Sequence, residues 1–313
     1  MSRWGVLLPT FDPFEQGRLH DVPAAARHAE ALCFDAVWAG DHLACHVPLL
    51  DAPTALAAAA AVTDRVALGL SVLLLGLRPT AWAAKQLATI DVLSGGRLLL
   101  GVGVGGEFPE EFTAAGVPLS RRGARLDEAL SVLPDLLAGR PVRHDGPALA
   151  LDVPALAPAL PATPPIYVGG RGEPALRRAA RFADTWLPMW LDPPTLAQRA
   201  QELGELAAGH GRPAPGVALL FGVCLDEDEE RARREAEAHL ARQYRLPLRV
   251  VERWTMLGTP ERVAPMLAAH AAAGVGEFIA MPLGRDPVGQ YERLTSLRAL
   301  VDGPASAIPT PGA

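Results

Sequence analysis

Two adjacent ionisable residues, Asp41 and His42, stand directly after the short apolar run Ala36–Ala39. That run predicts a buried strand, so the pair lies where a strand ends and a loop begins. An imidazole at such a position can act as a general acid, a general base or a hydrogen-bond donor to a ring, with the neighbouring carboxylate orienting it. An ordinary surface Asp and His in a loop explain the two residues equally well on position alone.

A glycine-rich segment follows another predicted strand and ends in the acidic residue Glu107. Its members are Gly103, Val104, Gly105 and Gly106. Alternating glycines let a backbone approach a ligand closely. The segment lacks the third glycine and the downstream acid of a dinucleotide fingerprint, so it indicates a strand end beside a ligand better than it indicates a Rossmann fold.

A second glycine loop, Gly169-Gly170-Arg171-Gly172, follows a predicted strand and leads into a predicted helix that starts at Glu173. Free backbone N–H groups at a helix N-terminus bind phosphate well, and Arg171 would add a positive charge. A tight turn without any ligand is the alternative.

Composition narrows the class of protein. Half of the 313 residues are hydrophobic, and the net charge is −6 without a basic stripe, which argues against nucleic-acid binding. The three cysteines (Cys33, Cys45, Cys224) show no CxxC spacing, and the histidines form no metal-binding motif. No apolar run reaches the roughly 18 residues of a membrane span, and the N-terminus lacks a signal peptide. We therefore expect no metal, no disulfide, no membrane or nucleic-acid partner, and a cytoplasmic location.

The positioning framework is an alternation of short apolar runs with longer amphipathic ones, typical of a parallel sheet wrapped by helices. Eight runs read as strands: Gly5–Pro9, Ala36–Ala39, Val66–Leu73, Leu98–Val102, Ile166–Gly169, Thr185–Met189, Val217–Cys224 and Glu277–Met281. Nine segments read as helices: Asp21–Leu32, Pro53–Val62, Thr80–Leu93, Arg122–Ala138, Glu173–Phe182, Pro194–Ala208, Glu227–Tyr244, Pro260–Ala273 and Val288–Val301.

This pattern predicts one α/β domain over residues 1–302, a (β/α)8 TIM barrel, whose chemistry would lie at the strand ends. Two insertions, at 139–165 and 244–258, are expected over the active face as lids or as plain structural loops, and His144-Asp145-Gly146 in the first could turn a short hairpin. The Pro- and Gly-rich tail, 303–313, is expected to be disordered.

An ordered set of motifs resembles the luciferase-like monooxygenase superfamily of flavin- and F420-dependent oxidoreductases. The most specific motif is Lys85 to Arg97, KQLATIDVLSGGR. The remaining motifs are Glu110-Glu111-Phe112, Gly116-Val117-Pro118, Arg122-Gly123, Asp127-Glu128, Pro165 to Gly170, Ala183-Asp184 and Gly258 to Glu261. These motifs resemble those of the F420-dependent branch more than those of the light-emitting branch.

The resemblance implies a ring lying across the strand ends, a non-prolyl cis peptide at Ser71-Val72 backing that ring, and Asp41 and His42 near its reactive centre. It also assigns ring and phosphate contacts to matched residues, namely Gly103, Val104, Gly105, Gly106, Val168, Gly169, Gly170, Arg171 and Gly172. Some relatives carry a catalytic glutamate where Gly106 stands here, so either Glu107 substitutes for that acid or it is absent.

The resemblance favours coenzyme F420 and hydride transfer to or from a small organic substrate, with His42 handling the proton. A reduced-FMN monooxygenase served by a partner reductase, and a non-catalytic flavin binder, are the alternatives. Relatives are often homodimers. Aromatic residues that could line the substrate pocket, or belong to the core, are Trp38, Phe108, Trp186, Trp190 and Trp254.

Overall fold

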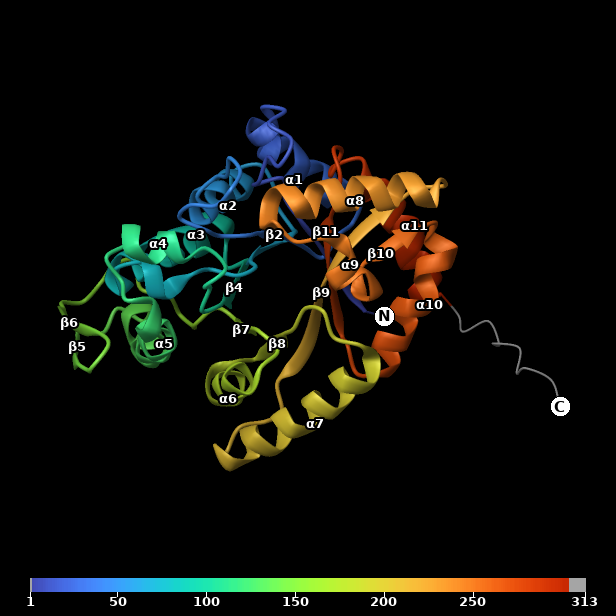
Figure 1. Ribbon diagram of the computed structural model, residues 1–313. Coiled ribbons are helices and arrows are strands. Elements are labelled where there is room, and N and C mark those ends of the chain that lie inside the picture. Colours follow the sequence, from blue (N-terminus) through green and yellow to red (C-terminus); the bar gives the residue numbers. More distant parts are fainter. Residues whose placement is uncertain (1, 304–313) are drawn as a thin grey trace.

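The computed structural model describes residues 2–303, and its centre is a closed barrel of eight parallel strands (Figure 1). The barrel strands are β1 (Arg3–Leu7), β2 (Ala36–Ala39), β3 (Ala67–Leu70), β4 (Leu98–Val102), β7 (Ile166–Gly169), β8 (Thr185–Leu187), β9 (Gly216–Leu225) and β11 (Glu277–Pro282). Neighbours pair in the order β11-β1-β2-β3-β4-β7-β8, and β9 joins β8 to β11 and closes the ring. The predicted (β/α)8 barrel is confirmed.

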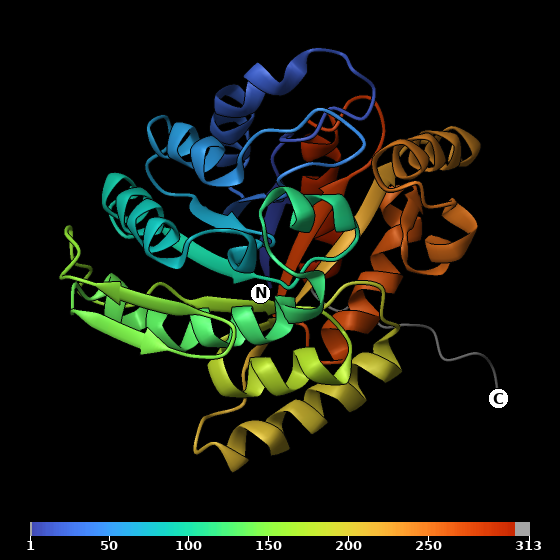
Figure 2. The same cartoon turned by 60° about the vertical axis from the view of Figure 1, so that its left-hand side comes forward.

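Helices surround this barrel (Figure 2). They are α1 (Val22–Ala31), α2 (Ala52–Ala60), α3 (Thr80–Ser94), α4 (Pro109–Ala114), α5 (Arg122–Leu137), α6 (Glu173–Phe182), α7 (Pro193–Gly209), α8 (Glu229–Tyr244), α9 (Leu248–Val251), α10 (Pro260–Ala272) and α11 (Gln290–Asp302). None of the described helices is long and apolar enough to cross a membrane.

Bulky side chains fill the barrel interior because glycines on neighbouring strands leave room for them. Trp38 of β2 is fully buried, and a Cβ added to Gly69 of β3 would lie 2.0 Å from its ring. A Cβ on Gly5 of β1 would lie 2.4 Å from its indole nitrogen. Below this layer, the buried Tyr167 hydroxyl donates to Glu277 at 2.9 Å. The interior is therefore packed, and a ligand has space only at the ends of the strands.

Three differences from the predicted elements bear on the site. The run Val66–Leu73 forms a strand only as far as Leu70, since the chain then turns into a bulge, Ser71–Leu74. The short helix α4 and the strand β10 (Met256–Gly258), which pairs with the far end of β9, were not predicted. α4 has six residues and β10 has three, so neither is long enough for its hydrophobic period to repeat.

The two insertions behave differently. Residues 142–153 form the predicted hairpin from β5 (Val142–Asp145) and β6 (Ala150–Val153). Its turn is held by Glu128 of α5, which accepts from the Ala148 and Leu149 amides, and no residue of 139–165 lines the cavity described below. Tyr244 and Leu246, at the start of the second insertion, do line it, and the role of the two insertions as lids stays a prediction. The predicted disordered tail falls, except for Gly303, outside the described residues.

Candidate active site

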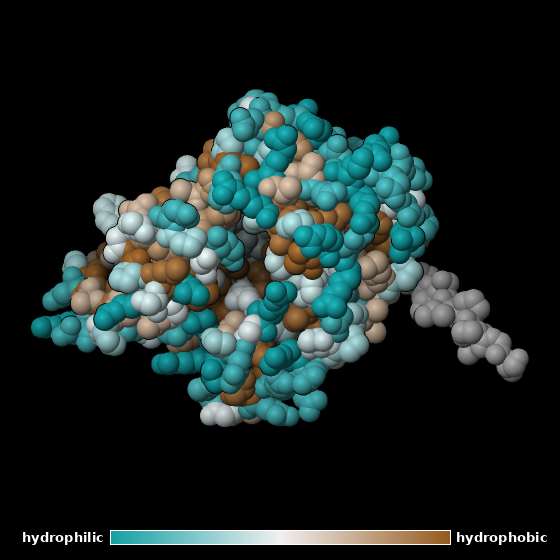
Figure 3. All heavy atoms as spheres, viewed as in Figure 1, coloured by the Kyte–Doolittle hydropathy of each residue, from teal (hydrophilic) through white to brown (hydrophobic). Residues whose placement is uncertain are grey.

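A cavity of about 620 Å³ opens at the carboxyl ends of the barrel strands. On the face shown in Figure 3 the surface is hollowed near its middle, between α4 and α8, and hydrophobic atoms border the hollow. Most of the residues predicted for the site line this cavity: Asp41, His42, Ser71, Val72, Gly103, Val104, Gly105, Glu107, Gly169, Gly170 and Arg171. Val168 is buried in the wall behind it, and Gly106 and Gly172 lie just beyond its lining.

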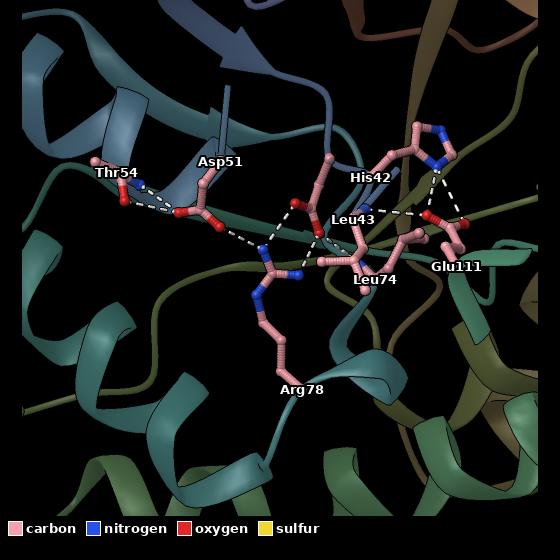
Figure 4. Close-up of polar contacts among 8 residues, drawn as sticks. His42, Leu43, Asp51, Thr54, Leu74, Arg78 and Glu111 are labelled. Carbon is pink, nitrogen blue, oxygen red and sulfur yellow. Dashed lines mark hydrogen bonds and ion pairs between the residues drawn. The ribbon is translucent and has the colours of Figure 1, made fainter. Parts of the chain in front are cut away.

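His42 is held by a carboxylate that the sequence interpretation did not single out. Its Nδ1 atom lies 3.2 Å from both carboxylate oxygens of Glu111, and the Leu43 amide donates to the same carboxylate at 3.0 Å (Figure 4). Because a carboxylate only accepts, Nδ1 carries the proton, and the second ring nitrogen, Nε2, is left to exchange one. Figure 4 shows that this nitrogen points away from Glu111.

The surroundings fix this imidazole in place. The Glu111 side chain has no exposed surface, and that of His42 is 12% exposed. Phe108 packs edge-on against the His42 ring with centroids 4.8 Å apart, and Phe11 does so from 6.2 Å. A histidine oriented by a buried carboxylate and open on one nitrogen is suited to general acid–base chemistry.

Glu111 comes from α4, the helix inserted after β4. The sequence interpretation quoted Glu110-Glu111-Phe112 only as part of a motif, and Glu107 was the acid considered. Glu107 lines the cavity but is exposed, whereas Glu111, four residues later and inside α4, is the acid that contacts His42. The available signal was the motif itself, in which Glu111 directly precedes the hydrophobic Phe112; both residues are buried.

The Asp41 carboxylate, which was expected to orient His42, bonds to other residues. Both of its carboxylate oxygens accept from the Arg78 guanidinium, at 2.7 and 2.9 Å, and one also accepts from the Leu74 amide at 3.0 Å. Burial raises the pKa of Asp41, and the Arg78 charge opposes that rise. With its oxygens occupied, Asp41 connects the β2 end to the bulge after β3 and is a positioning residue.

Arg78 extends the connection to the next helix. It also donates to Asp51 at 2.8 Å, and Asp51 caps α2 by accepting from the Thr54 amide at 3.0 Å (Figure 4). Burial works against ionisation of Asp51, but the hydrogen bonds from Thr54 and Arg78 lower the pKa of its carboxyl. The β2 loop, the bulge and α2 are thus held by one guanidinium.

The bulge presents Val72 to the cavity, and the Ser71–Val72 peptide is cis, as the resemblance implied. A Cβ on Gly103 would lie 2.3 Å from Val72 Cγ2, and one on Gly169 would lie 2.9 Å from Val72 Cγ1. A Cβ on Gly101 would lie 1.9 Å from the Leu70 carbonyl oxygen. Glycines at these strand ends were predicted to let the backbone approach a ligand closely. In the structure their missing side chains make room for the bulge, and the bulge forms part of the cavity wall.

Gly103→Ala is therefore expected to displace Val72 and to destabilise the protein by about 1–3 kcal/mol, the usual cost of overpacking. Gly209→Ala is the matched control, because a Cβ there meets nothing within 4 Å. Urea denaturation of both variants checks this. If the two variants had the same free energy of unfolding, Gly103 would not be the residue that makes room for Val72.

The second glycine loop offers unpaired backbone donors. Gly170 has φ of 114°, which turns the chain sharply between β7 and α6. Within the part of the chain that the structure describes, the amides of Arg171, Gly172 and Glu173 have no hydrogen-bond acceptor. The Arg171 side chain donates to the Trp190 carbonyl at 3.2 Å and lies 5.6 Å from the centroid of the Trp190 ring. The loop can hold an anionic group on its amides, beside a guanidinium already placed at the rim.

Of the aromatic residues considered as pocket walls, only Trp190 lines the cavity. Trp38 and Trp186 are fully buried in the core, Phe108 packs behind His42, and Trp254 lies outside the lining. Trp190 has φ of 57°, a left-handed conformation that costs a non-glycine residue energy and recurs at functional sites.

Comparison with known proteins decides the family. The family model described as luciferase-like monooxygenase matches residues 3–255, well over half of the 313 residues. The chain belongs to the luciferase-like monooxygenase family.

Two relatives illustrate the range of sequence similarity. An uncharacterised protein of Mycobacterium tuberculosis is 35% identical over 182 residues, which cover 57% of this chain and 62% of the relative, so the match spans less than two thirds of that protein. An F420-dependent glucose-6-phosphate dehydrogenase of Nakamurella multipartita is 31% identical over 233 residues, 71% of this chain and 67% of the relative.

Solved structures share the fold at lower identity. An F420-dependent secondary alcohol dehydrogenase, in complex with an F420-acetone adduct, superposes with a TM-score of 0.83 at 20% identity and covers 96% of this chain and 99% of its own. Structures named as monooxygenases, one of them in complex with FMN, share the fold as well.

Proposed function

We propose that this protein is an oxidoreductase that uses coenzyme F420 to transfer a hydride to or from a small organic substrate. The observation that carries the proposal is the His42–Glu111 pair at the cavity. Hydride transfer to a carbonyl carbon leaves an oxygen that must gain a proton, and a histidine oriented by a carboxylate is placed to supply it. The relative named as an F420-dependent dehydrogenase supports the choice of coenzyme.

The residues present fit such a coenzyme. The bulge at Val72 and the glycines of β4 and β7 form a wall without long side chains, suited to a flat ring. The free amides of 171–173 and Arg171 suit the coenzyme phosphate. The cavity volume of about 620 Å³ lies within the usual range of cofactor and ligand sites.

When bound, the deazaflavin supplies or accepts a hydride at its ring carbon five. In the reducing direction, His42 Nε2 would give its proton to the oxygen of the substrate carbonyl group, so that the product is an alcohol. Glu111 keeps the proton on His42 Nδ1 in place. Its negative charge would also stabilise the imidazolium before that cation gives up the Nε2 proton and when it takes a new proton from solvent. Oxidation of an alcohol uses the same groups in reverse.

A reduced-FMN monooxygenase is the second candidate, favoured by the solved structure of the same fold that contains FMN. That function would bring a flavin reductase as partner. A non-catalytic flavin binder is the least favoured reading, because the His42–Glu111 pair is intact. We further propose that the protein acts as a homodimer in the cytoplasm.

Titration of the purified protein with F420 and, separately, with FMN tests the coenzyme, with fluorescence as the signal. We expect saturable F420 binding that is at least about tenfold tighter than FMN binding, a difference of roughly 1.4 kcal/mol. Tight binding of FMN alone would favour the monooxygenase, and binding of neither would favour the non-catalytic alternative.

A further inference from the structure

The order of strands around the barrel divides the cavity lining into two halves. Val72 follows β3, Gly103 follows β4, and Gly169 ends β7, so the small residues occupy three neighbouring strands. The remaining lining residues, apart from those after β2, lie on or follow β8, β9, β11 and β1, and these four strands are also neighbours. His42 follows β2, between β1 and β3, where the two halves meet.

The second half is bulky and uncharged. Its principal members are Phe11, Met189, Trp190, Leu220, Tyr244 and Leu246. Burial raises the pKa of the Tyr244 phenol to about 12, so this hydroxyl is neutral at ordinary pH. The hydroxyl lies 4.0 Å from the weakly accepting Met281 sulfur, and at the cavity lining it can also bond a ligand.

The ionisable residues that line the cavity either are paired with another residue or lie outside the bulky half. Asp41 is neutralised by Arg78, and His42 is held by Glu111. Glu107 lies on the β4 side and is negative, and Arg171, the one lining arginine, belongs to the glycine loop and is bonded to a carbonyl oxygen. Apart from Arg171, which lies against Trp190 at the edge of the bulky half, no described cation lines this half. A substrate phosphate placed away from that edge would therefore lose its hydration without gaining an ion pair.

From this division we infer that the substrate is a neutral, largely apolar molecule that carries one carbonyl or hydroxyl group, and that it binds against the bulky half with this group directed to His42. The inference rests on the proposed function. It separates this chain from its relative named for glucose 6-phosphate, because the bulky half holds no group that would recognise a phosphorylated sugar.

The first test is a substrate panel with whichever coenzyme binds in the titration. Cyclohexanone, acetophenone and cyclohexanol represent the neutral apolar class, and glucose and glucose 6-phosphate represent the polar class. We expect kcat/KM for the best apolar compound to exceed that for glucose 6-phosphate by at least about a hundredfold, equivalent to some 2.7 kcal/mol. Comparable or better turnover of glucose 6-phosphate would overturn the inference.

A charge introduced into the bulky half gives the second test. Leu246→Arg is expected to raise KM for the apolar substrate by about tenfold or more while leaving the coenzyme Kd within about threefold, because a guanidinium in the lining penalises contact with an apolar ligand. Val250→Arg, in the same insertion but exposed and outside the lining, is the matched control. An unchanged KM in Leu246→Arg would contradict the assignment of this wall to the substrate. Failure of F420 to bind is seen earlier, in the titration, and refutes the proposed coenzyme rather than the substrate class.

Discussion

His42→Ala is expected to lower kcat by about 10²–10⁴-fold, the usual contribution of a positioned general acid or base. The coenzyme Kd should stay within about threefold, because the ring-binding wall is formed by the Val72 bulge and the strand-end glycines. Steady-state kinetics at saturating coenzyme would measure the loss in kcat, and fluorescence titration would measure Kd.

Glu111→Gln separates the proton role from a merely structural one. The amide keeps the size of the side chain but removes the negative charge that stabilises the imidazolium at 3.2 Å. We expect a smaller loss of kcat than in His42→Ala, with the coenzyme Kd again within about threefold. Full turnover in either variant would refute the assignment.

Asp41→Ala is expected to have the largest effect on stability. The Asp41 side chain has no exposed surface, and its removal leaves Arg78 without its bidentate partner and the Leu74 amide without an acceptor. Breaking a buried pair from one side costs about 3–5 kcal/mol. Since Arg78 is 16% exposed and keeps Asp51, we expect a value near the lower limit, about 3 kcal/mol, measured by urea denaturation.

The same variant should weaken coenzyme binding, because Asp41 anchors the bulge that carries Val72. Asp51→Asn is the matched control, since asparagine still caps α2 and the Arg78–Asp51 pair is partly exposed. We expect it to cost less than about 1 kcal/mol. If Asp41→Ala lost no more stability than Asp51→Asn, the anchoring role would be refuted.

The barrel could be predicted from the sequence because its strands share one pattern, a short and continuous run of apolar residues. Strands that are buried on both faces are continuous apolar runs, and the helices between them are amphipathic or carry caps such as Thr259-Pro260. The elements that were missed, α4 and β10, are too short for a period to be visible. They are placed by tertiary contacts such as the Glu111–His42 hydrogen bond.

The location of the site was predictable and its internal roles were not. The strand-end rule brought Asp41, His42 and two glycine loops to one cavity. Which acid contacts His42 depends on the path of the chain after β4. Whether Arg78 reaches Asp41 to form the ion pair depends on the turn that follows the bulge. Neighbouring in sequence, Asp41 and His42 point to different partners, so their adjacency gave no information about their separate roles.

The oxygen dependence of turnover tests hydride transfer with F420 most directly. Wild-type protein would be mixed with reduced F420 and a neutral ketone, with and without oxygen, and the alcohol and the oxidised coenzyme would be quantified. We predict equal amounts of both products and the same rate in the absence of oxygen. Turnover that requires reduced FMN together with oxygen, with no reaction from F420, would contradict the proposal.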